Sequence, residues 1–94
     1  MMERVSQFII SGNYFAKGFI TTLNGFAEKL ESDIFIIVDG EEHNAKKLYS
    51  MVSRDPIKVG QTIKVVCYNN DTKKALSDLD KMREFIENDY RRTD

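Results

Sequence analysis

The amino-acid sequence predicts an α+β fold, an open-faced β-sandwich in which one four-stranded, mostly antiparallel sheet carries its helices on a single face. Three observations lead to this fold class. Strand-like runs alternate with helical stripes, a hairpin signal lies in the middle of the chain, and 94 residues without an internal repeat are enough for one domain, residues 1–94. The predicted order of elements is β-α-β-β-α-β-α.

The first strand and the first helix meet at a turn. Residues 5–10 form a β-rich run, which Ser11-Gly12-Asn13 closes with turn chemistry. From Ala16 onward the apolar period changes to three and four residues, which predicts an amphipathic helix. Its apolar stripe is Ala16, Phe19, Ile20, Leu23, Phe26, Ala27 and Leu30, and Lys17, Thr21, Asn24 and Glu28 lie away from it.

The middle of the chain reads as a hairpin followed by a short helix. Residues 34–38 are an apolar strand, and Asp39-Gly40 is a tight turn into a short polar strand at residues 41–44. Residues 45–52 are ambiguous, but Leu48, Met51 and Val52 on one side favour a brief helical segment. Arg54-Asp55-Pro56 ends it, because the residue before a proline is disfavoured in a helix.

A fourth strand and a long helix complete the predicted fold. Residues 62–68 are the strand, and residues 69–72 offer side chains that can cap a helix N-terminus. The apolar positions of the final helix are Ala75, Leu76, Leu79, Met82 and Ile86, and residues 91–94 are expected to be a frayed tail.

Composition argues against several classes of function. Fourteen basic and 15 acidic residues give a net charge of −1, which lacks the excess that phosphate neutralisation needs, so we expect no nucleic-acid partner. No run is long enough for a membrane span or a signal sequence, so we expect a soluble, cytoplasmic protein without a membrane partner. Cys67 reads as a small buried hydrophobe, and His43 alone is a poor ligand set. We therefore expect no metal site and no cofactor.

The order of elements and several local motifs resemble HPr, the histidine-containing phosphocarrier family of the bacterial sugar phosphotransferase system. The resemblance covers nearly the whole chain. Residues 12–19, Gly-Asn-Tyr-Phe-Ala-Lys-Gly-Phe, stand where the family has Gly-x-His-Ala-Arg-Pro-Ala at the start of its first helix, with one extra residue here. The hairpin Asp39-Gly40, the run Asn44-Ala45-Lys46 and residues 59–63, Val-Gly-Gln-Thr-Ile, are similar to further family segments.

The departures from the family concern its chemistry. Aligning on Ala16 places Phe15 at the phosphohistidine position, whereas an ungapped count from Gly12 places Tyr14 there. Neither side chain has a ring nitrogen that could accept and release a phosphoryl group. The regulatory serine of Gram-positive members is replaced by Lys47. The resemblance therefore implies a divergent bacterial member that lacks both phosphorylation sites, and we expect no catalytic residue and no enzymatic activity.

The expected function is that of a non-phosphorylatable regulatory or protein-interaction module. Its partner would be a phosphotransferase-system enzyme or a transcriptional regulator. Two alternatives stay open: a phosphocarrier that uses an unusual acceptor, and an α+β domain that binds an anion or small molecule where Lys17, Lys46 and Lys47 converge at two helix starts. Phe15 is either an exposed anchor or a core residue. The predicted partner-binding residues are Tyr14, Phe15, Lys17, Phe19, Lys46, Lys47, Leu48, Tyr49 and Val52.

Overall fold

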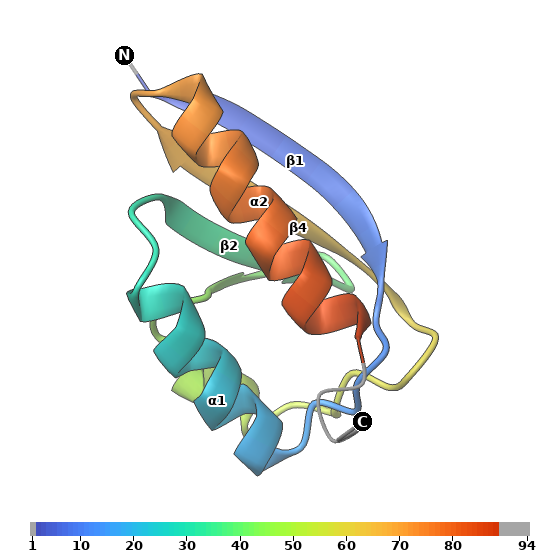
Figure 1. The fold of residues 1–94 in the computed structure, drawn as a ribbon. Coiled ribbons are helices and arrows are strands. Elements are labelled where there is room, and N and C mark those ends of the chain that lie inside the picture. Colours follow the sequence, from blue (N-terminus) through green and yellow to red (C-terminus); the bar gives the residue numbers. More distant parts are fainter. Residues whose placement is uncertain (1, 89–94) are drawn as a thin grey trace.

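A four-stranded antiparallel sheet, with strand order β1-β4-β2-β3, forms one layer of the molecule, and both α-helices lie on one of its faces (Figure 1). The structure is a computed structural model, and it describes residues 2–88. This arrangement confirms the predicted open-faced sandwich. The elements are β1 (Glu3–Ile10), α1 (Lys17–Glu28), β2 (Asp33–Val38), β3 (Glu41–Asn44), the 3₁₀ helix η1 (Leu48–Met51), β4 (Thr62–Asn69) and α2 (Thr72–Glu87).

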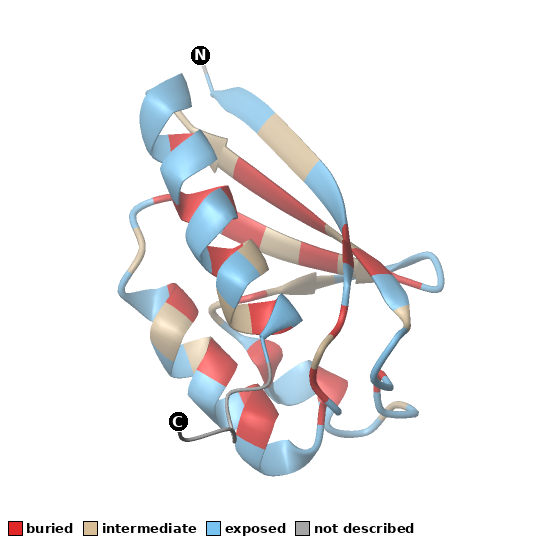
Figure 2. Cartoon of the chain, turned by 45° about the vertical axis from the view of Figure 1, so that its right-hand side comes forward, coloured by how far each residue is buried: buried red, intermediate tan, exposed pale blue. Residues whose placement is uncertain are grey.

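The core lies between the sheet and the helices, as the buried residues in Figure 2 indicate. Side chains alternate between the two faces of a strand, so every second residue points toward the helices. The sheet contributes Ile9, Ile34, Ile36, Ile63 and Val65 to this core, and each is 1 % exposed or less. The apolar stripe of each helix covers them.

Turn and cap positions follow the sequence signals. Asp39 and Gly40 both have positive φ angles, 51° and 76°, which is the backbone of the tight two-residue hairpin turn between β2 and β3. The carboxylate of Asp71 accepts a hydrogen bond from the backbone N–H of Lys73, so Asp71 is the N-cap of α2.

Three details differ from the sequence prediction. The segment expected to be helical over residues 45–52 forms a single 3₁₀ turn, because the Ala45 N–H donates to Ile34 O and so extends the strand pairing. Ala16 and Leu76, both assigned to apolar helix stripes, are exposed. Ala16 is exposed because it is the N-cap that precedes α1, and Leu76 lies outside the stripe that faces the sheet.

The loop after β1 holds the end of α2. The Asn13 side-chain amide donates hydrogen bonds of 3.0 Å to Ile86 O and 2.6 Å to Asn88 O, and the Gly12 N–H donates to Ile86 O at 2.9 Å. These donors satisfy carbonyl groups that a helix end leaves without intrahelical partners. A side chain at Gly12 would collide with Glu87 O, which lies 1.7 Å from the position of a Cβ atom.

The predicted frayed tail, residues 91–94, lies outside the described residues. Neither helix of the described part of the chain combines the length and the apolar character that crossing a bilayer demands.

Candidate functional site

The two residues that precede Ala16, Tyr14 and Phe15, differ in how far they are buried. Phe15 is 1 % exposed, and its ring packs against that of Phe19 with the centroids 4.8 Å apart. Its N–H donates to Ile57 O at 2.8 Å, so a loop far away in the sequence holds it over the core. Tyr14 is 45 % exposed. Of the two alternatives left open for Phe15, its burial supports the core residue, so its inclusion among the partner-binding residues is wrong. Tyr14 is the accessible aromatic residue of this loop.

Two other predicted contact residues also lie in the core. Phe19 and Leu48 are 1 % and 0 % exposed, because Phe19 is on the buried stripe of α1 and Leu48 begins η1 on the side that faces the core. Neither can contact a partner in this conformation. The exposed members of the predicted set are Tyr14, Lys17, Lys47, Tyr49 and Val52, and Lys46 is half-buried.

The lysines do not converge at two helix starts as expected. Lys46 Nζ donates to Leu30 O at 2.8 Å, which places this ammonium just beyond the C-terminal end of α1. Lys17 is the first residue of α1, at the other end of a 12-residue helix about 18 Å long. The start of η1 lies nearer the C-terminal half of α1, because the Leu48 N–H donates to Asn24 Oδ1 at 2.7 Å.

A surface groove runs between α1 and η1 and brings together three of the predicted residues. We call it the α1–η1 groove. Its volume is about 250 Å³, and its lining residues are Lys17, Ile20, Thr21, Asn24, Tyr49 and Val52. Tyr49 is 75 % exposed and Val52 is 47 % exposed, so the apolar wall supplied by η1 and the residue after it is open to solvent.

Sequence reasoning did not assign three residues of this groove to the site: Ile20, Thr21 and Asn24. A signal was present, because Lys17, Thr21 and Asn24 are spaced four and three residues apart and therefore share one helix face. The contact that brings η1 against this face is the hydrogen bond between Asn24 and Leu48.

A second and larger cavity, of about 430 Å³, lies between α1 and α2 and contains none of the predicted site residues. The rings of Phe26 and Phe85 stack there with centroids 4.6 Å apart. Lys81, Glu84 and Asn88 complete its lining. It is an apolar cleft between the two helices, with one cation and one anion in its lining.

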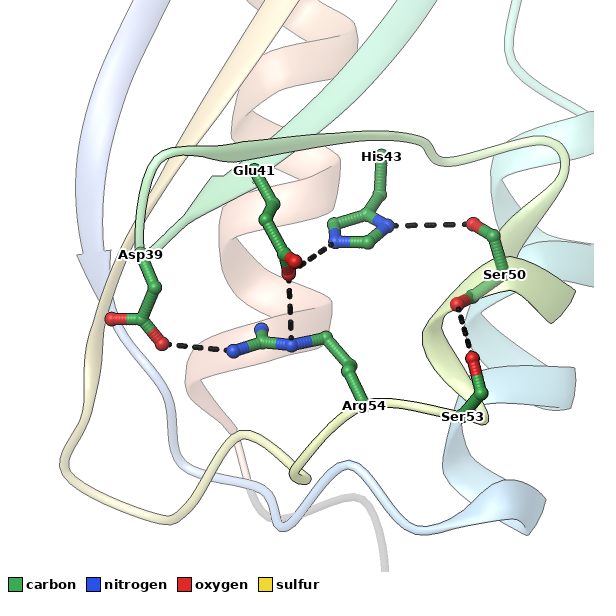
Figure 3. A network of polar contacts seen from close by, with 6 residues as sticks. All are labelled: Asp39, Glu41, His43, Ser50, Ser53 and Arg54. Carbon is green, nitrogen blue, oxygen red and sulfur yellow. Dashed lines mark hydrogen bonds and ion pairs between the residues drawn. The ribbon is translucent and has the colours of Figure 1, made fainter.

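His43 lies on β3 and takes part in a polar cluster (Figure 3). Its Nδ1 lies 3.4 Å from Ser50 Oγ, and its Nε2 lies 3.4 Å from Glu41 Oε1. The Arg54 guanidinium contacts both Glu41, at 3.2 Å, and Asp39, at 2.8 Å. This cluster joins the β2–β3 hairpin to η1 and the loop after it. Within residues 2–88, no group of three acidic, histidine or cysteine side chains could hold a metal ion.

Cys67 is fully buried on β4, in agreement with its assignment as a core residue. Burial and the nearby Asp78 carboxylate raise the pKa of its thiol from 9.0 to about 12. A thiol with so high a pKa stays protonated and unreactive at neutral pH.

The fold is an α+β open-faced sandwich, in which the loop between β1 and α1 is hydrogen-bonded to the end of α2. More particularly, the chain has an HPr-like fold. It is similar to the crystal structure of a phosphocarrier protein HPr from Bacillus anthracis str. Ames, with a TM-score of 0.76 and 21 % sequence identity, over 89 % of this chain and 98 % of that one. No family model and no curated protein matches the sequence.

Proposed function

We propose that this chain is a non-phosphorylatable interaction module that binds a protein partner through the α1–η1 groove. The observation that carries the proposal is the exposed apolar wall of Tyr49 and Val52 beside α1, on a scaffold whose loop before α1 offers Tyr14 in place of an imidazole. An exposed aromatic residue beside an aliphatic one is typical of interaction surfaces.

The electrostatics of the groove favour an acidic partner surface. Lys17 is an exposed lining residue, and within residues 2–88 no acidic side chain lines the groove. A partner carboxylate near Lys17 and an apolar side chain against Tyr49 would match this arrangement. An enzyme of the phosphotransferase system and a transcriptional regulator are the two partner types that the HPr-like fold suggests.

A transfer assay separates this proposal from a phosphocarrier function. The chain is incubated with enzyme I of the phosphotransferase system and phosphoenolpyruvate, and its intact mass is measured. We expect no added phosphate, since the only histidine of the sequence, His43, lies on β3 rather than in the loop before α1 and contacts Glu41 and Ser50. A stoichiometric, acid-labile phosphate would contradict the proposal.

Titrations with two probes distinguish a docking surface from an anion site. With enzyme I as the probe, NMR shifts of the isotopically labelled chain should centre on the α1–η1 groove, and Tyr49→Ala should weaken binding about tenfold or more. Leu76→Ala is the matched control, because Leu76 is also exposed but lies on α2. Shifts confined to the start of α1 upon addition of inorganic phosphate would favour the small-molecule alternative instead.

A further inference from the structure

The face of the sheet that the helices leave uncovered carries several large apolar side chains, with Lys64 in register between Phe8 and Ile37. Alternation along the strands places Phe8, Phe35, Ile37, Val66 and Tyr68 on this face, since their strand neighbours Ile9, Ile34, Ile36, Val65 and Cys67 belong to the core. Phe8 is 70 % exposed. Ile10, 61 % exposed, extends the surface along β1. We call these residues, Phe8, Ile10, Phe35, Ile37, Val66 and Tyr68, the open-face cluster.

The open-face cluster is ordered in the free chain. Val66 is only 1 % exposed although it is not part of the core between sheet and helices, so its neighbours on the open face cover it. Phe35 lies beside it in register, and the Phe35 and Tyr68 rings meet edge to face at 5.8 Å. A surface packed in advance loses little side-chain entropy when it binds.

On the same face of the sheet, basic residues lie on one pair of strands and acidic residues on the other pair. Lys64 and Arg4 lie on β4 and β1, whereas Asp33 and Glu42 lie on β2 and β3. Register pairs Ile37 with both Lys64 and Glu42, and Tyr68 with both Arg4 and Asp33. None of these four charged side chains forms an ion pair within residues 2–88.

We propose that the open face binds a second copy of this chain, with the two sheets packed face to face. A two-fold axis parallel to the strands turns the β1–β4 half of one copy toward the β2–β3 half of the other, because the order of strands is reversed across such an axis. The basic half of each copy then meets the acidic half of its partner. Aligned packing of two sheets is the arrangement of a β-sandwich.

The size of the face predicts the strength of this association. At about 4.8 Å between strands and about 3.3 Å per residue, strands of 8, 8, 6 and 4 residues have an outline of roughly 400 Å². Stable complexes bury about 800 Å² per partner, so we expect a weak dimer with a dissociation constant of about 10–100 µM. The inference does not depend on the proposed function, because the α1–η1 groove lies on the helical side of the sheet.

Sedimentation velocity from about 10 µM to about 1 mM tests the dimer, and the wild-type sedimentation coefficient should rise with concentration. Phe8→Glu should raise the dissociation constant at least tenfold, because it places a carboxylate in the apolar surface opposite the acidic half of the other copy. The variant should fold, since Phe8 is exposed. Leu76→Glu, the same kind of change on α2, is the matched control and should dimerise like the wild type.

A charge exchange tests the proposed orientation. Lys64→Glu and Glu42→Lys should each weaken the dimer, and the double variant should recover most of the lost affinity because opposite charges again face each other. A wild-type chain that remains monomeric at the highest concentration would overturn the proposal. A dimer that Phe8→Glu leaves unchanged would also overturn it, since the contact would then lie on another surface.

Discussion

Phe15 belongs to the core of the molecule rather than to its surface, and its removal should be costly. Truncation to alanine deletes a ring that is 1 % exposed and packs on Phe19, so we expect Phe15→Ala to lower the free energy of unfolding by about 3–5 kcal/mol. Thermal unfolding followed by circular dichroism should show a decrease of more than about 10 °C. Tyr49→Ala, at a 75 % exposed position, is the control and should shift the midpoint little.

A histidine introduced at position 14 should be accessible to a phosphoryl donor, whereas one introduced at position 15 should not. A histidine at residue 14 would stand on the surface, whereas one at residue 15 would be buried and would lose the packing on Phe19. If enzyme I docks on this chain, Tyr14→His should acquire an acid-labile phosphate and Phe15→His should not. Phosphate on the Phe15→His variant alone would show that the loop rearranges in the complex.

The buried thiol of Cys67 should make the free energy of unfolding decrease at alkaline pH. Its folded pKa of about 12 exceeds 9.0, so below pH 9 the thiol is protonated in both states, and between 9 and 12 only the unfolded chain releases the proton. The free energy of unfolding therefore decreases as pH rises through this range. We compare the wild type with Cys67→Ala between about pH 8 and about pH 10.5. Above pH 9 the free energy of unfolding of the wild type should fall more steeply than that of the variant, by up to about 1.4 kcal/mol per pH unit. Urea unfolding in reducing buffer measures both slopes, and equal slopes would contradict the assignment.

At the scale of the elements, two glycines should respond in opposite ways to the same substitution. Gly25 lies inside α1, and no neighbouring atom lies within 4 Å of the place that a Cβ atom would take. Gly25→Ala should therefore stabilise the fold by about 0.5–1 kcal/mol through helix propensity. Gly12→Ala should destabilise it, because the new Cβ would meet the Glu87 carbonyl. Chemical denaturation of the two variants, which add the same methyl group, compares them directly.

The boundaries of the elements were largely predictable because they depend on neighbouring residues. The Asp39-Gly40 turn and the Asp71 cap are local signals, and both function in the structure as the sequence suggests. The location of Phe15 was not predictable in this way. It depends on a hydrogen bond to Ile57, 42 residues further along the chain, and no local pattern reports such a contact.

The same distinction applies to the candidate site. Tyr49 and Val52 could be singled out because a short segment rich in apolar residues cannot bury all of them. The spacing of Lys17, Thr21 and Asn24 indicates that they share one face of α1, but it does not indicate that η1 packs on that face, because the hydrogen bond between Asn24 and Leu48 joins distant residues. Ile20 looks like any other member of the α1 stripe until this contact is known. The polar cluster of Figure 3 was missed for a similar reason, because Arg54 reaches it from a loop.

At the scale of the whole molecule, the hydrogen bonds from Asn13 to the end of α2 join positions as much as 75 residues apart. Closing so long a loop costs conformational entropy, so this contact does not stabilise early, partly folded states of the chain. During synthesis, the loop that leads into α1 lacks these contacts until residue 88 has left the ribosome. The start of α1 should therefore acquire its final conformation late, and nascent chains that stop before α2 should leave this loop open to proteases although β1 has already been made.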